Sequence, residues 1–188
     1  MNKLRILDAL TLAVSCARTQ AADQLSGYLC CNMRTDGSRI TDINYDESGK
    51  HLVPAGSRIA VTGYGHHRVK VTLENRSQII SNDYSRDLSM KDFAQRYVVA
   101  NDPNVEIGSY SQKVQNAIHQ ARVMIGMSRE QVLMALGYPV SSENPNLADK
   151  TWNYWLFTWL AFKVRFDDAG RVIGVDSDSQ TKERVLAD

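Results

Sequence analysis

The segment GMSREQVLMALGYP, at residues 126–139, specifies a short helix together with both of its ends. Ser128 is a good N-cap, because its hydroxyl can accept a hydrogen bond from an amide of the first turn. Gln131 stands three residues later and completes a capping box with Ser128. Gly137 occupies the position of a left-handed helix stop, and Pro139 prevents continuation. The segment therefore predicts a capped helix with an apolar face made of Val132, Leu133 and Leu136.

The chain on either side of this helix predicts one more helix and three antiparallel strands. Upstream, apolar residues recur at helical spacing between residues 114 and 125, after a cap at Ser109 or Ser111. Downstream, residues 151–157 are rich in strand-forming aromatics, and residues 160–166 alternate between apolar and polar. The sequence Asp-Asp-Ala-Gly at 167–170 predicts a hairpin turn into a return strand at 171–175.

These segments together resemble the SmpA/OmlA family, which includes the BamE lipoprotein of the outer-membrane β-barrel assembly machinery. The resemblance covers roughly residues 110–178. It is carried by Gly-Met-Ser at 126–128, Val132, Leu-Gly-Tyr-Pro at 136–139, Trp-Asn-Tyr at 152–154, and the hairpin words Val-Arg-Phe-Asp at 164–167 and Gly-Arg-Val at 170–172.

The resemblance implies two helices packed on a three-stranded sheet in the C-terminal part. It also implies a non-enzymatic cell-envelope protein that works through protein contacts, in outer-membrane protein assembly or envelope integrity. Protein inhibitors of β-lactamase share this small fold, so the fold does not fix the function. The alternative is a periplasmic binding or inhibitor module that uses the aromatic sheet face.

Composition indicates a soluble globular protein of one large or two small domains. The chain has 188 residues, of which 43% are hydrophobic and 23% charged, and a net charge of +1. Such a balance gives no reason to expect nucleic-acid binding. No apolar run approaches the roughly 18–20 residues that a transmembrane helix requires.

The first 22 residues have the layout of a secretory signal. A basic start is followed by a short apolar stretch and by small residues before Ala22. Asp8 within the apolar stretch argues for the alternative, an amphipathic N-terminal helix of a cytoplasmic protein. Cys16 is a candidate for lipidation and membrane anchoring, as in members of the family. Cleavage without lipidation is the other outcome of export, so we expect a location in the periplasm or at the outer membrane.

Cys30 and Cys31 are adjacent, and neighbouring cysteines rarely bond each other. They point to opposite faces if the segment is a strand. A disulfide framework is therefore not expected. One cysteine is expected in the core and the other as a half-buried thiol.

The N-terminal half predicts a small β-rich domain, either SH3-like or a barrel. Strands are expected at residues 28–33 and 39–45, and a hairpin at 57–62 and 68–73. A capping signal at Ser89 opens a helix through about residue 98. The break at residues 101–104 suggests a domain boundary. The expected fold class is α+β, organised as a signal at 1–22, a β-rich domain at 23–100 ending in a helix, an ααβββ domain at 105–180 and a tail at 181–188.

No residue pattern indicates a catalytic, cofactor or metal site. The sequence Gly-Tyr-Gly-His-His at 63–67 lacks the third glycine and the following helix of a nucleotide loop. A hairpin with two exposed imidazoles explains it better than a metal site does. No activating motif surrounds either cysteine, so a Cys–His nucleophile pair has little support. Asp167 and Asp168 are explained by turn formation.

The aromatic cluster at residues 152–162 is the candidate interaction site. Strand alternation places Trp152 and Tyr154 on one face, and Trp155 and Phe157 on the other. Two helices cover only one face of a sheet, so some of these rings are expected to be exposed or to contact the N-terminal domain. The candidate partner surface comprises Trp152, Tyr154, Trp155, Phe157 and Trp159.

Overall fold

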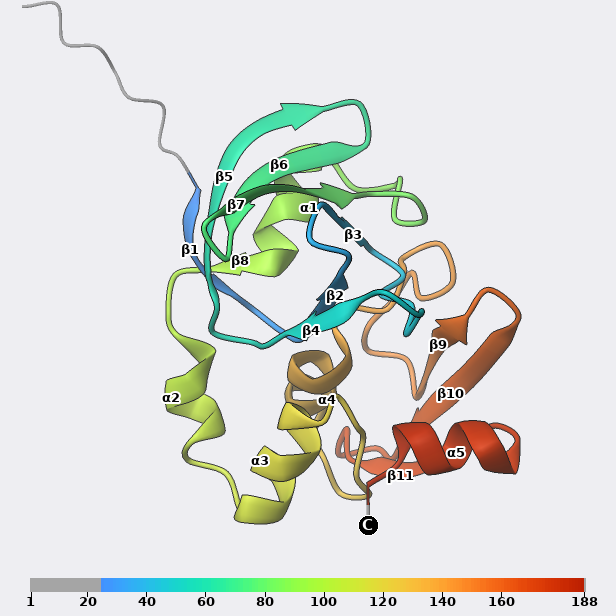
Figure 1. Cartoon of the computed structure of the whole chain (residues 1–188). Coiled ribbons are helices and arrows are strands. Elements are labelled where there is room, and N and C mark those ends of the chain that lie inside the picture. Colours follow the sequence, from blue (N-terminus) through green and yellow to red (C-terminus); the bar gives the residue numbers. More distant parts are fainter. Residues whose placement is uncertain (1–24, 188) are drawn as a thin grey trace, which may run out of the picture.

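Two sheets and five short helices make up residues 25–187, the part of the chain that the computed structural model describes (Figure 1). The larger sheet is curled, and its eight strands run in the order β4-β2-β3-β7-β6-β5-β1-β8. Neighbouring strands are antiparallel except β3 and β7, which are parallel. The strands are β1 (Ser26–Leu29), β2 (Met33–Thr35), β3 (Arg39–Thr41), β4 (His51–Val53), β5 (Arg58–Gly65), β6 (Arg68–Leu73), β7 (Arg76–Ser81) and β8 (Val98–Val99).

The smaller sheet has three antiparallel strands in the order β11-β10-β9. None of the helices in the described residues is long and apolar enough to cross a bilayer. The strands are β9 (Thr151–Phe157), β10 (Leu160–Phe166) and β11 (Val172–Asp176), and the helices are α1 (Met90–Tyr97), α2 (Pro103–Ile107), α3 (Gln112–His119), α4 (Arg129–Leu136) and α5 (Ser179–Val185).

The expected fold class is wrong. The structure is mostly sheet, with one large curled sheet beside a small one, rather than a small barrel followed by two helices on a three-stranded sheet. Sequence patterns predicted neither β7 nor its parallel pairing with β3, which extends the large sheet across the N-terminal half. They also missed α2 and α5, two short helices that begin at the caps Asp102 and Asp178.

Three expected elements differ in their extents. The strand expected at residues 28–33 is split, because Cys30, Cys31 and Asn32 separate β1 from β2. The strand expected at 39–45 ends at Thr41. The helix expected to run towards Ile125 ends at His119, because Ala121 takes a left-handed conformation with φ of 54°.

The core of the large sheet is filled by α1. This helix is capped as predicted by Ser89, whose hydroxyl accepts from the Asp92 amide at 3.1 Å. Its buried residues are Phe93, Ala94 and Tyr97. The rings of Phe93 and Tyr97 pack edge-on with their centroids 5.1 Å apart. They pack against the inward residues of the strands, among them Val69, Val71, Leu73, Ile59 and Val61.

The second core joins α3, α4 and α5 to the inner face of the small sheet. The predicted capping box of α4 is confirmed: the Ser128 hydroxyl accepts from the Gln131 amide, and the Gln131 side chain accepts from the Ser128 amide at 2.9 Å. Gly137 ends the helix with φ of 82°. Trp152 packs edge-on against Phe166 with ring centroids 4.7 Å apart.

A layer of buried amides lies between the two cores. The Asn32 side chain donates to the carbonyl oxygens of Ile118 at 2.5 Å and Ala135 at 3.1 Å, and accepts from the Ala55 amide at 3.0 Å. Asn44 donates to the Leu136 carbonyl at 2.9 Å. These bonds tie the large sheet to the carboxyl ends of α3 and α4. The expected boundary at residues 101–104 lies at the start of α2.

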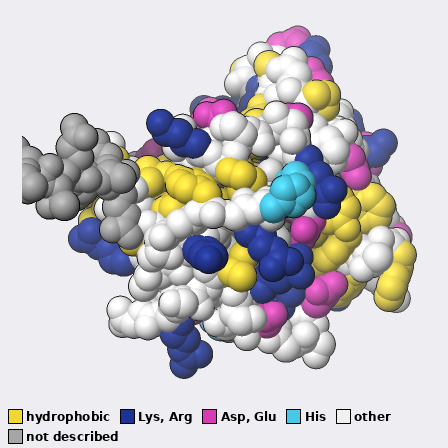
Figure 2. Space-filling view, turned by 90° about the horizontal axis from the view of Figure 1, so that it is seen from above, with side chains coloured by type: hydrophobic (Ala, Val, Ile, Leu, Met, Phe, Trp, Pro, Cys, Tyr) yellow, Lys and Arg dark blue, Asp and Glu magenta, His cyan; other side chains and the backbone are white. Residues whose placement is uncertain are grey.

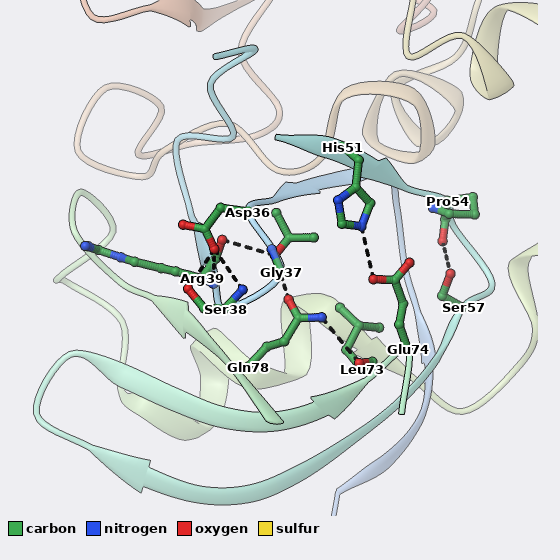
Figure 3. A network of polar contacts seen from close by, with 11 residues as sticks. Asp36, Gly37, Ser38, Arg39, His51, Pro54, Ser57, Leu73, Glu74 and Gln78 are labelled. Atoms are coloured by element: carbon green, nitrogen blue, oxygen red, sulfur yellow. Dashed lines mark hydrogen bonds and ion pairs between the residues drawn. The ribbon is translucent and has the colours of Figure 1, made fainter. Parts of the chain in front are cut away.

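Polar contacts hold the turns at the open side of the large sheet (Figure 3). The Asp36 carboxylate accepts from the amides of Ser38 and Arg39 at 2.8 and 2.7 Å. His51 of β4 faces Glu74 of the β6–β7 turn, with 3.1 Å between ring nitrogen and carboxylate oxygen. The sheet therefore curls far enough for its edge strand to contact a turn three strands away.

Candidate functional site

Two of the five aromatic residues predicted to form a partner surface are core residues. Trp152 and Tyr154 are 1% and 7% exposed and face the helices. The Trp152 indole donates to the Leu147 carbonyl at 3.2 Å, and the Tyr154 hydroxyl donates to the Gly137 carbonyl at 3.1 Å. Burial strongly raises the pKa of Tyr154. Their assignment to a partner surface is therefore wrong, because the helices cover this face of the sheet.

The other three aromatic residues are not fully buried in this core, although Phe157 packs against it. Trp155 and Phe157 are half-buried on the opposite side of β9. The Trp155 indole donates to the Glu143 carboxylate at 2.9 Å, and the Arg184 guanidinium lies 4.8 Å from the Phe157 ring centroid. Trp159, in the turn between β9 and β10, is 83% exposed. We refer to Trp155, Phe157 and Trp159 as the aromatic hairpin surface.

The turn that carries Trp159 is close to two tyrosines of the N-terminal half. Tyr45 lies close to Tyr84 and to Thr158, the residue before Trp159. Burial and the neighbouring Tyr84 raise the pKa of Tyr45. Tyr84 is itself 45% exposed. Residues from both halves of the chain thus meet next to the turn that carries Trp159.

The surrounding surface carries charges of both signs. Figure 2, which views the molecule from above, shows basic, acidic and apolar groups interspersed on that face. On the small sheet, Arg165 pairs with Asp176 at 2.9 Å. This pattern suits a local contact with a protein better than it suits a polyanion, which requires a continuous basic patch.

A cavity of about 780 Å³ lies between the β1–β8 edge of the large sheet and the helices α2 and α4. Figure 1 shows α2 below β1 and β8, on the same side of the molecule as α4. The walls are largely apolar and aromatic. They include Tyr28, Val99, Leu133, Met134 and Tyr138.

The cavity wall also contains a disulfide between Cys30 and Cys31. The expectation that these neighbours would not bond is wrong. They lie in the turn between β1 and β2 rather than in a strand, so their side chains need not point to opposite faces. Cys31 is 1% exposed, and Cys30 is half-buried. Because their sulfurs are bonded to each other, neither Cys30 nor Cys31 offers a free thiol to a histidine.

Three carboxylates line the cavity: Asp102, Glu106 and Glu130. Asp102 caps α2 by accepting from the Asn104 amide at 2.9 Å, and Glu106 accepts a hydrogen bond from the Tyr110 hydroxyl. Hydrogen bonds from the Glu130 amide and the Ser128 hydroxyl lower the pKa of Glu130. None of the three forms an ion pair within 4.0 Å with any residue of the described chain.

The remaining candidates form turns. His66 and His67 are in the β5–β6 turn, with ring centroids 3.9 Å apart. Asp167 accepts from the Arg171 amide at 2.8 Å, and Asp168 pairs with Lys150. Within residues 25–187 no three histidine, cysteine or acidic side chains gather as metal ligands do. Cys16 and the signal expected at residues 1–22 lie outside the described residues.

Comparison of the chain with protein-family models, with curated proteins and with solved structures finds no match. The resemblance of residues 110–178 to the SmpA/OmlA family therefore stays a prediction. The cavity was not predicted. No pattern in the sequence indicated it, because its wall residues come from segments that the fold brings together.

Proposed function

We propose that this is a non-enzymatic protein of the cell envelope that binds a protein partner through the aromatic hairpin surface. The observation that carries the proposal is the 83% exposure of Trp159 on a hairpin whose opposite face is fixed in the core. Exposing a tryptophan to water is unfavourable, and tryptophan is among the residues most enriched at the energetic centres of interfaces. Trp155 and Phe157 extend the apolar area beside it.

The disulfide supports a location outside the reducing cytosol. Disulfides persist in oxidising compartments such as the periplasm and are rare in cytosolic proteins. The Cys30–Cys31 bond therefore agrees with the export suggested by residues 1–22. The resemblance to the SmpA/OmlA family suggests that the partner is a component of the outer-membrane assembly machinery. A lipid anchor at Cys16 would hold the protein at that membrane.

Affinity purification from envelope extracts tests the partner. The full chain is expected to co-purify an outer-membrane assembly protein, identified by mass spectrometry, and Trp159→Ala is expected to lose it. Tyr64→Ala is the matched control, because Tyr64 is also exposed (49%) but lies in β5 of the large sheet. Equal recovery with wild type and Trp159→Ala contradicts the proposal. Recovery of a stoichiometric soluble hydrolase instead supports the inhibitor alternative.

The mass of the mature N-terminus tests the location. Export predicts loss of Met1, and lipidation predicts a diacylglyceryl mass on Cys16. A chain isolated from the cell with Met1 intact contradicts the envelope location, whatever its partner.

A further inference from the structure

We propose that the cavity between β1, β8, α2 and α4 binds a small amphipathic cation, a molecule with an apolar body and an ammonium or guanidinium group. This site is separate from the aromatic hairpin surface, and the inference does not depend on the proposed function. Its volume of about 780 Å³ is within the range of roughly 300–1,000 Å³ typical of small-molecule sites. Its occupant is indicated by the chemistry of the walls.

The apolar part of the ligand is indicated by the side chains of the floor and rim. Leu133 and Met134 are only partly buried on α4 and face the cavity together with the Cys30–Cys31 disulfide. Val105 of α2 is 79% exposed at the same cavity. A hydrocarbon group of the ligand would remove these side chains from water at a gain of roughly 25 cal/mol per Å².

The positive charge of the ligand is indicated by charge complementarity. Asp102, Glu106 and Glu130 line the cavity, whereas no lysine or arginine does. The carboxylates have hydrogen-bond donors but no ion-pair partner among the described residues. An anionic ligand would meet three like charges along the walls of the cavity, whereas a cation would be attracted by them.

The limits of the cavity favour a small molecule over a peptide. At one end stands Tyr28, whose ring is covered by the Arg58 guanidinium at 4.1 Å from its centroid. Arg96 lies 5.3 Å from the ring centroid of Tyr138. Neither arginine lines the cavity. The hollow beyond Tyr28 is lined by Arg58 itself, so a basic peptide crossing Tyr28 would meet a like charge.

The test uses decylammonium as the probe, with decanoate and decanol as probes of equal chain length but different charge. Isothermal titration calorimetry on the full chain is expected to show decylammonium binding that weakens with added salt, because the carboxylates are partly exposed. Decanoate is expected to bind at least about tenfold more weakly. Equal binding of all three probes, or of none, overturns the proposal.

Variants locate the site. Glu106→Gln and Glu130→Gln keep the size of the side chain and remove its charge, and each is expected to weaken decylammonium binding about tenfold. Val105→Arg places a cation of the protein at the rim and is expected to abolish binding, while its exposure leaves folding intact. Glu183→Gln, an exposed carboxylate on α5, is the matched control and is expected to bind as wild type.

Two further outcomes overturn the proposal. The first is unchanged decylammonium binding in Val105→Arg and in both glutamine variants, since binding then occurs elsewhere. The second is binding of a lysine-containing apolar peptide with shifts of NMR signals at Val105 and Met134, but no binding of decylammonium. That result would assign the cavity to a protein partner. Unchanged melting temperatures keep the variants comparable.

Discussion

The side chain of Asn44 donates a hydrogen bond to the backbone carbonyl of Asn32, 3.1 Å away. The side-chain amides of both asparagines also bond to α4. The Asn44 side chain donates to the Leu136 carbonyl and the Asn32 side chain to the Ala135 carbonyl. Two residues of the N-terminal half therefore bind carbonyls of the last helical turn that have no partner within the helix. Asn44 also accepts from the Arg34 amide at 2.7 Å and has φ of 55°. Asparagine tolerates this left-handed conformation better than most residues.

Removing either amide should destabilise the whole protein. Asn32→Ala leaves the carbonyl of Ala135 and the amide of Ala55 without a partner, whereas the Ile118 carbonyl still accepts from the Ala121 amide at 2.9 Å. Each unsatisfied buried group costs about 1–3 kcal/mol, so a loss of at least about 2 kcal/mol is expected in urea unfolding. Asn44→Ala should cost a similar amount.

The double variant Asn32→Ala/Asn44→Ala should lose less than the sum of the single variants, because the two side chains share one network. A strictly additive result would show that the two asparagines act independently. Unfolding in two separate transitions would show that the two cores are not coupled.

The adjacent cysteines should resist alkylation until they are reduced. Treatment of the denatured chain with iodoacetamide is expected to leave Cys30 and Cys31 unmodified, because their sulfurs are bonded to each other. Dithiothreitol reduces the disulfide by thiol–disulfide exchange and is itself oxidised to a cyclic disulfide. After this treatment both cysteines should be labelled. Peptide mapping separates them from Cys16. Full labelling of Cys30 and Cys31 before reduction would contradict the disulfide.

Asp36 should titrate far below an ordinary aspartate. Hydrogen bonds from the Ser38 hydroxyl and from the amides of Ser38 and Arg39 lower its pKa to about 2. Because the pKa of Asp36 is lower in the folded state, its ionisation stabilises the fold at pH values above 3.8, the pKa in the unfolded chain. This contribution is lost as the pH falls towards 2.

An NMR titration of the Asp36 carboxyl signal measures this pKa directly. The amide signals of Ser38 and Arg39 should shift with the same midpoint. Asp178, at the start of α5, provides an internal comparison, because hydrogen bonds from the Thr181 hydroxyl and amide also lower its pKa. A midpoint near 3.8 for Asp36 would show that the turn does not hold its carboxylate.

Truncation of Trp152, near the start of β9, should destabilise the protein far more than truncation of Trp159, in the β9–β10 turn. Trp152→Ala empties a fully buried site and should cost about 3–5 kcal/mol in urea unfolding. Trp159→Ala should change stability by no more than about 0.5 kcal/mol, because the side chain is 83% exposed. A large loss of stability in Trp159→Ala would place this residue in the core and remove the basis of the proposed contact.

Local signals predicted the elements whose residues are close in sequence. The caps of α1 and α4 and the β5–β6 hairpin are confirmed, since a capping side chain bonds an amide three residues away and a hairpin pairs neighbouring segments. The inward and outward faces of β9 were also predicted by simple alternation. What alternation did not show was which face the helices cover, so Trp152 and Tyr154 were misassigned.

Several of the features that the sequence did not predict depend on contacts between residues that are distant along the chain. β3 pairs in parallel with β7, some forty residues later, and no local pattern specifies that partner. The cavity depends on residues from β1, β8, α2 and α4, most of which are distant from one another in the sequence. The Cys30–Cys31 bond requires a turn where the alternating pattern predicted a continuous strand.

The amide layer has a consequence for the order in which the chain folds. The Asn32 side chain bonds residues 86 and 103 positions later, and that of Asn44 bonds one 92 positions later. Closing such long loops is entropically costly and slow. During synthesis or translocation, the large sheet therefore has buried amides without partners until residue 136 has emerged. A chain stopped before α4 should bind chaperones that the complete chain releases.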